Sequence, residues 1–334
     1  MTKVQNGVRF QVDHRGESST DVILDKLALN DHTPLQPLRA RALAKFRSNQ
    51  FLPALLDLKS PLHKGYLNTW FCSDILLQTP EKIRTKLCKR RWCVVCNRIR
   101  TAKLIHQYKD VLDSMECRSF VTLTTNYTNA CTDKRRLASV ITMYGKAFTR
   151  VWRRLKRKHG KIVAIRKTEI AYSRGDGMSR TGEYFHPHFH LIMPNDKGQA
   201  NDLVNEWLKE FPKANVQAQN IRVADDGSQL ELFKYFTKLY DGGGNEAPSR
   251  DVNPYGDVKL SYPAKAMDTI FQVMNGRKIL QTYGGKILND VVMDIDGEVE
   301  ITPEDMDYIK PRHEIWQWYQ PAITWTNAEG ECIV

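Results

Sequence analysis

The sequence contains no apolar run that approaches the roughly 18 residues needed to cross a membrane. Residues 1–21 are polar and of mixed charge, which is not the pattern of a secretory leader. Cysteine is scarce and uneven, because four of the seven lie between Cys72 and Cys96. This distribution suits a metal cluster in a reducing cytoplasm better than a disulfide framework. We therefore expect a cytoplasmic globular protein without membrane contact.

Negative charge is scarce in the first 288 residues. Eleven of the 38 acidic residues but only two of the 50 basic residues lie from Asn289 on, which leaves 48 basic and 27 acidic residues before it. Such a basic chain favours a polyanionic partner, most often nucleic acid. A solvated basic surface is the alternative. The acidic end is predicted to be a separate extension.

Histidine is rare too, and three of the nine lie within His186-Pro187-His188-Phe189-His190. The bulky and β-branched residues that follow predict a strand. Residues i and i+2 of a strand share one face at about 7 Å, so His188 and His190 form a candidate pair of metal ligands. Glu169 lies in the preceding predicted strand, 161–172, which we expect to pair antiparallel with the histidine strand. It is either a third ligand or a solvated edge residue.

Three cysteines follow the spacing C-x4-C-x2-C in a stretch rich in Lys and Arg: Cys88, Cys93 and Cys96. Thiolates at this spacing on a turn can close on one Zn²⁺, and neighbouring cations favour the thiolate form. Cys72 would complete four sulfur ligands, with His63 or His106 as alternatives. Buried cysteines without a metal are the other possibility.

An amphipathic helix is predicted from about residue 133 to 159, with Gly160 placed to end it. Its last turns carry six basic residues: Arg150, Arg153, Arg154, Lys156, Arg157 and Lys158. Cations at this end complement the helix dipole. Six in nine residues exceed that need, so we also expect contacts with phosphates.

Another helix is predicted from Ser228, because Ser228 and Glu231 have the spacing of a capping box. At 100° per residue, Leu232 and Phe233 belong to its apolar stripe, whereas Tyr235 faces the other way. Packing does not explain Tyr235, which is either functional or a surface tyrosine. Glu231 is ambiguous, because capping alone accounts for it.

Three blocks together resemble, in order, the motifs of plasmid rolling-circle replication initiators of the HUH endonuclease superfamily, in the group with one catalytic tyrosine. The blocks are Phe120-Val121-Thr122-Leu123-Thr124, His186-Pro187-His188-Phe189-His190 and Lys234-Tyr235-Phe236-Thr237-Lys238. The cysteine-rich segment and residues 276–285 are also similar to segments of that family. The resemblance covers roughly residues 65–287.

The resemblance implies an α+β fold in which helices flank a central antiparallel sheet, related to the ferredoxin-like folds. It implies that His188 and His190 hold Mg²⁺ or Mn²⁺, with Glu169 as the candidate third ligand. A structural Zn²⁺ would occupy the cysteine-rich segment.

The resemblance also implies a reaction on single-stranded or hairpin origin DNA. Tyr235 would attack a phosphate, leaving a 5′-phosphotyrosine and a free 3′-OH. Lys238 would assist through its charge, and Glu231 would activate the water that ends replication. A host helicase and polymerase would be further partners.

The expected organisation has four parts. They are a polar and basic N-terminal arm (1–60), a cysteine-rich segment that binds zinc and DNA (61–117), a nickase core (118–287) and an acidic extension (288–334). A transposase or relaxase of the same superfamily is one alternative, although the chain has no room for a relaxase's usual helicase part. A zinc-dependent DNA-binding regulator without catalysis is another, but it leaves the histidine pair unexplained.

Overall fold

The larger sheet of the protein has five antiparallel strands in the order β8-β5-β7-β6-β9. Their bounds are β5 (Arg118–Leu123), β6 (Ala164–Ser173), β7 (Tyr184–Pro194), β8 (Asn220–Val223) and β9 (Leu280–Tyr283). The computed structural model describes residues 4–5, 8–9, 36–78, 83–115, 117–125, 133–173, 184–233, 262–284 and 314–333. An antiparallel sheet with flanking helices confirms the predicted α+β class.

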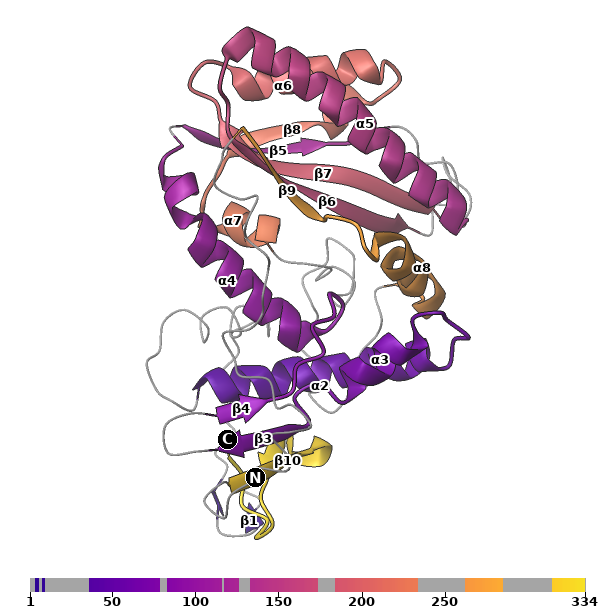
Figure 1. The fold of residues 1–334 in the computed structure, drawn as a ribbon, viewed down its shortest axis with the longest axis vertical. Coiled ribbons are helices and arrows are strands. Elements are labelled where there is room, and N and C mark those ends of the chain that lie inside the picture. The colour runs from indigo at the N-terminus through magenta and orange to yellow at the C-terminus, as the bar shows by residue number, and fades with distance from the viewer. Residues whose placement is uncertain are drawn as a thin grey trace.

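Helices cover both faces of this sheet (Figure 1). Helices α5 (Lys134–His159) and α6 (Gln199–Glu210) lie on one face, and α4 (Val94–Asp113) and α7 (Asp226–Phe233) lie on the other. Because side chains alternate along a strand, the central strand β7 supplies both layers. Phe189 and Leu191 pack with the apolar residues of α5 and α6, whereas His190 faces Glu231 on α7.

The long helix α5 matches the predicted amphipathic helix closely. Asp133 caps its start, since the Asp133 carboxylate accepts a hydrogen bond from the Arg135 backbone N–H at 2.7 Å. Gly160 ends it with a φ of 74°, a left-handed value that glycine adopts without steric cost. The apolar stripe between these two residues is buried against the sheet.

Pro187 lies in the central strand, although proline removes a donor from a sheet. Strand β5 ends with Leu123 opposite Phe189, so at Pro187 the strand β7 is paired only with β6. A residue without an N–H is tolerated where one neighbour is missing. His188 therefore lies next to the point at which β5 stops pairing with β7.

A smaller antiparallel sheet lies at the opposite end of the molecule (Figure 1), with the order β11-β10-β3-β4. Its strands are β3 (Ile75–Gln78), β4 (Ile83–Thr85), β10 (Glu314–Tyr319) and β11 (Thr324–Thr326). Strand β10 pairs antiparallel with β3, with Trp316 opposite Leu76. The end of the chain is therefore built into the same unit as the cysteine-rich segment.

Three helices lie between the two sheets (Figure 1): α2 (Gln36–Leu56), α3 (His63–Trp70) and α8 (Ala264–Met274). Within the predicted N-terminal arm, α2 is a packed helix whose Leu38, Ala42 and Phe46 are buried. A short pair of strands, β1 (Val4–Gln5) and β2 (Val8–Arg9), precedes it. No helix among the described residues is long and apolar enough to cross a bilayer. A turn signal at 296–297 also predicts a hairpin over 291–301, but it lies outside the described residues.

Candidate active site and metal centres

The β6–β7 hairpin brings three candidate ligands together. Glu169 lies directly opposite His188 in the register, and Lys167 lies opposite His190. The Nε2 atom of His190 is 3.3 Å from Glu169 Oε2, and that of His188 is 4.0 Å from Glu169 Oε1. The three ligand atoms all lie within 4.8 Å of one another. The structure therefore places Glu169 beside the histidine pair and not at a solvated edge.

Hydrogen bonds orient both imidazoles toward Glu169. His190 Nδ1 lies 3.1 Å from the Thr122 hydroxyl, and His188 Nδ1 lies 3.1 Å from the His186 carbonyl oxygen. Each ring thus turns its Nε2 toward the carboxylate, an arrangement in which a partner on the other ring nitrogen fixes a ligand's orientation. Thr122 belongs to the first of the three sequence blocks, so that block supports the second across the sheet.

The donor set fits a divalent cation. Burial lowers the pKa of His188 to about 3, so its imidazole is neutral at physiological pH and has a lone pair to donate. Among the described residues, His190 Nε2 is buried without a hydrogen-bond partner, which is costly unless another group satisfies it. Two imidazoles and one carboxylate would satisfy a divalent transition-metal ion or Mg²⁺ with open positions for substrate.

Helix α7 brings a second carboxylate to this face. Its start differs from the prediction, because Asp225 rather than Ser228 is the capping residue. The Ser228 N–H donates to Asp225 Oδ1 at 2.8 Å, and the Asp225 N–H donates back to Ser228 Oγ at 3.2 Å. Glu231 is thereby released from capping, and its Oε1 lies 3.9 Å from His190 Nε2. Capping therefore does not account for Glu231, whose catalytic role stays a prediction.

Lys167 is a residue of this site that sequence reasoning missed. It is 5% exposed, and its ammonium lies 3.1 Å from Glu169 Oε2 and donates to the Glu231 carbonyl oxygen at 3.0 Å. Lys167 has the same strand parity as Glu169, which was the available signal. Tyr235 and Lys238 lie outside the described residues, and the described part of α7 ends at Phe233.

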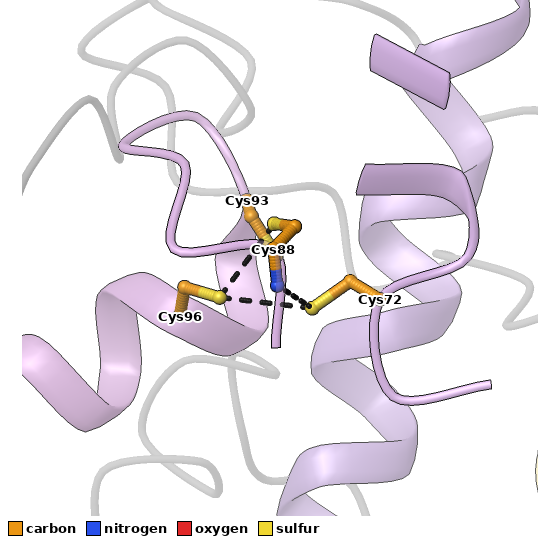
Figure 2. Close-up of side chains that lie close together, drawn as sticks. All are labelled: Cys72, Cys88, Cys93 and Cys96. Carbon is orange, nitrogen blue, oxygen red and sulfur yellow. Dashed lines mark hydrogen bonds between the residues drawn. The ribbon is translucent and has the colours of Figure 1, made fainter. Parts of the chain in front are cut away.

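The second candidate centre contains four cysteines, whose side chains turn toward one another in Figure 2. Cys93 and Cys96 lie at the start of α4, and Cys72 and Cys88 lie in loops. The Cys96 sulfur is 3.6 Å from those of both Cys72 and Cys88. Tetrahedral Zn²⁺ with bonds of about 2.3 Å separates its sulfurs by about 3.8 Å. Cys72 therefore completes the set of four sulfurs, and His63 is not part of it. The side chain of the other alternative, His106, lies outside the described part of the chain.

The four cysteines change one another's pKa. Hydrogen bonding to Cys88 raises the pKa of Cys72 well above its ordinary value, and burial raises the pKa of Cys93 likewise. Burial opposes ionisation of Cys88, but hydrogen bonds from the other three thiols outweigh it and lower the pKa of Cys88 well below its ordinary value. The cluster thus stabilises one thiolate by itself. Four thiolates at this distance require a metal to compensate their charge.

The cysteine cluster is tied to the rest of the molecule by two cations. Lys45, 1% exposed, donates to the carbonyl oxygens of Trp70 and Cys72 at 3.0 Å each. Arg91, between Cys88 and Cys93, donates to the carbonyl oxygen of Arg277 at 2.5 Å, just beyond α8. The segment around the cluster therefore holds the connection between α8 and the edge strand β9.

The basic end of α5 lies on the face of the sheet away from the histidines (Figure 1). Three of its six cations pair with acidic residues of α6. The salt bridges are Arg150–Glu210 at 2.6 Å, Arg154–Glu210 at 2.8 Å and Lys158–Asp202 at 2.7 Å. The other three, Arg153, Lys156 and Arg157, are exposed and make no ion pair within the described part of the chain. The phosphate contacts predicted for this end are thus best supplied by these three.

The chain matches the model of the Rep_1 replication protein family over residues 81–281. It is also 27% identical over 140 residues to a "Protein rep" of Streptococcus pneumoniae serotype 2 (strain D39 / NCTC 7466). That match spans 41% of this chain and 41% of the relative. No solved structure matches the chain significantly. Because the family match covers more than half of the chain and includes the histidine pair, Glu169 and Glu231, the chain belongs to the Rep_1 replication proteins, as its resemblance to plasmid rolling-circle initiators predicts.

Proposed function

We propose that this replication initiator nicks and rejoins single-stranded DNA at a plasmid or phage-like origin through a covalent 5′-phosphotyrosine intermediate. The observation that carries the proposal is the convergence of Glu169, His188 and His190 with Glu231 on one face of the sheet. Helix α7, which carries Glu231, ends at Phe233, directly before Lys234-Tyr235-Phe236-Thr237-Lys238 in the sequence. A protein that only binds DNA has no need of such a cluster.

Glu169, His188 and His190 would hold a Mg²⁺ or Mn²⁺ ion. Such an ion, when bound, supplies Lewis-acid stabilisation of the charge that develops on a scissile phosphate. The neutral imidazole of His188 and the hydrogen bond between Thr122 and His190 prepare these ligands in advance. Lys167 keeps the Glu169 carboxylate in place beside both rings.

Tyr235 is proposed as the nucleophile. Its phenolate oxygen would form a bond to the scissile phosphorus while the bond to the 3′ oxygen breaks, and the 3′ oxygen takes up a proton. The products are a 5′-phosphotyrosine and a free 3′-OH that primes synthesis. Lys238 would assist through its charge on the phenolate or the phosphate. Glu231 would accept the proton of the water that ends replication.

Binding of the DNA is proposed to involve the basic surfaces. The exposed cations of α5 and the cysteine-rich segment would contact phosphates without reading sequence. A Zn²⁺ held by Cys72, Cys88, Cys93 and Cys96 would be structural. A host helicase would then unwind the duplex, and a host polymerase would extend the 3′-OH. The protein would act in the cytoplasm.

Nicking of an origin strand tests this function. We expect the protein to cut a labelled single strand from its own replicon with Mn²⁺, and His188→Ala to lose cutting while retaining DNA binding. Ser139→Ala, on the exposed side of α5, is a control that should cut normally. Unchanged cutting by His188→Ala would refute the metal assignment. Binding without any cutting by the folded, metal-loaded protein would favour the regulator.

A further inference from the structure

Arg222 lies on the edge strand β8, directly opposite Phe120 in the register with β5. Its Nη2 atom donates to Glu231 Oε2 at 2.9 Å, and its Nη1 atom donates to Ser228 Oγ at 2.6 Å. The guanidinium also lies over the Phe120 ring, 4.4 Å from its centroid. Arg222 therefore contacts helix α7 at two points and the sheet at a third.

These contacts connect Arg222 with the metal-binding face. The Phe120 ring stacks on the His190 imidazole, with centroids 5.1 Å apart and an interplanar angle of 29°. Arg222, Phe120 and His190 thus form a continuous stack across three neighbouring strands. A displacement of Arg222 would therefore shift His190 through the packing of the Phe120 ring, and it would shift Glu231 through the ion pair.

Glu231 is held at both its side chain and its backbone. Arg222 binds Oε2, while Oε1 faces His190 Nε2 at 3.9 Å. Lys167, which is buried, donates to the Glu231 carbonyl oxygen at 3.0 Å. A glutamate side chain would otherwise sample several rotamers. Because Nη1 binds Ser228 while Nη2 binds Glu231, the rigid guanidinium fixes the carboxylate relative to the start of α7, which the single ammonium of a lysine does not do.

We propose that Arg222 is a positioning residue that directs the Glu231 carboxylate to the water used in the step that ends replication. This inference rests on the proposed nicking function and extends it to a residue outside the three sequence blocks. In that step the water oxygen bonds to the scissile phosphorus and its proton passes to Glu231. The bond from phosphorus to the 3′ oxygen breaks, and that oxygen takes up a proton from solvent. Arg222 touches neither the water nor the DNA in this scheme.

The proposal predicts different effects on two products, which arise from attack on the same phosphate by two different nucleophiles. Attack by Tyr235 gives a protein–DNA adduct, whereas attack by water gives a free 5′-phosphate strand and no adduct. With a labelled origin strand and Mn²⁺, we expect Arg222→Gln to form the adduct within about threefold of the wild-type rate. The free 5′-phosphate product should fall at least about tenfold. Arg222→Lys should recover part of that loss, because it restores one charge beside Glu231.

A double-mutant cycle distinguishes positioning from a general structural effect. If Arg222 acts through the Glu231 carboxylate, Arg222→Gln should lower the water product no further once Glu231→Gln is present. Arg136→Gln, an exposed arginine in the first turn of α5, is the matched control and should form both products normally. Circular dichroism and thermal melting show whether each variant is folded. If Arg222→Gln does not fold, Arg222→Lys carries the test, with normal adduct formation and a smaller fall of the water product.

Three results would overturn the inference. The first is an equal fall of both products in a folded variant. The second is a water product that Arg222→Gln leaves unchanged, and the third is a water product that it lowers equally with and without the Glu231 carboxylate. A wild-type protein that forms neither product would instead refute the nicking function itself, so the two failures are distinguishable.

Discussion

The Thr122 hydroxyl lies 3.1 Å from Nδ1 of His190, across the β5–β7 pair. This contact leaves Nε2 of His190 directed at Glu169. It joins the strand of the first sequence block to the metal-binding block, although the two are 68 residues apart. A residue of the first block therefore orients a candidate metal ligand of the second block.

Thr122→Val removes this hydrogen bond and keeps the shape of the side chain. We expect the affinity for Mn²⁺ to fall by about tenfold or more, because partners of a ligating histidine contribute on that scale. Titration calorimetry measures it. Thr149→Val, at an exposed position of α5, should bind Mn²⁺ normally. A Thr122→Val protein with unchanged affinity would show that the contact does not orient the ligand.

Loss of the zinc ligands should destabilise more than the cysteine-rich segment. Native mass spectrometry is expected to find one tightly bound Zn²⁺ per chain. Cys96→Ser should lose it and lower the free energy of unfolding by about 4 kcal/mol or more. Because Arg91 binds the Arg277 carbonyl, hydrogen exchange should also rise at the end of α8. Cys117→Ser, at an exposed cysteine outside the cluster, should keep both the metal and the stability.

The end of the chain should contribute to stability. Trp325 is fully buried, and its Nε1 donates to the Ser73 carbonyl oxygen at 2.8 Å. Trp325→Ala should cost about 3–5 kcal/mol in denaturant unfolding. Tyr319→Ala, at a side chain that is 50% exposed, should cost less than about 1 kcal/mol. Equal and small losses of unfolding free energy in both variants would mean that β10 and β11 contribute little to the stability of the fold.

This packing changes how the acidic extension has to be tested. Two roles fit an acidic segment on a basic protein: a module that screens the DNA groove or contacts a host protein, or a packed solubilising extension. Deletion of residues 289–334 would remove β10 and β11 and confound affinity with folding. Asn substitutions at the aspartates between residues 290 and 307 remove charge instead. If these leave DNA affinity unchanged, screening is refuted.

The exposed and the paired cations of α5 should differ in their effect on DNA binding. Replacing Arg153, Lys156 and Arg157 with Gln should reduce the slope of log K against log salt concentration by about 2, at about 0.7 per lost contact with a single strand. Replacing Arg154 and Lys158, which pair with α6, should change it less. An unchanged slope in the triple variant would remove this end of α5 from the DNA interface.

Local sequence pattern was enough for the parts of the site that lie within one element. Strand alternation predicts that His188 and His190 share a face, and helical spacing with Asp133 and Gly160 predicts α5 to within a residue of each end. The cap of α7 was predicted wrongly because Ser228 fits two capping boxes, with Glu231 or with Asp225. Arg222 donates to both Ser228 and Glu231, so the choice depends on a contact from another strand.

The residues that sequence reasoning missed are those whose partners are distant in the chain. Lys45 reaches Cys72, Arg91 reaches Arg277, and Lys167 reaches Glu231. A buried cation is unfavourable without partners, so nothing in its own segment predicts its burial. These contacts follow from the register of the sheets and the docking of α2 and α8, which are properties of the whole fold.

The most direct test of nicking chemistry is covalent trapping. Wild-type protein and Tyr235→Phe are incubated with a labelled single-stranded library from the replicon and Mn²⁺, and adducts are resolved on a denaturing gel. An adduct in the wild type that is lost in Tyr235→Phe is the predicted result. An adduct retained in Tyr235→Phe would move the nucleophile elsewhere, with Tyr240 the next candidate. No adduct from folded, metal-loaded protein on DNA that it binds would contradict the account.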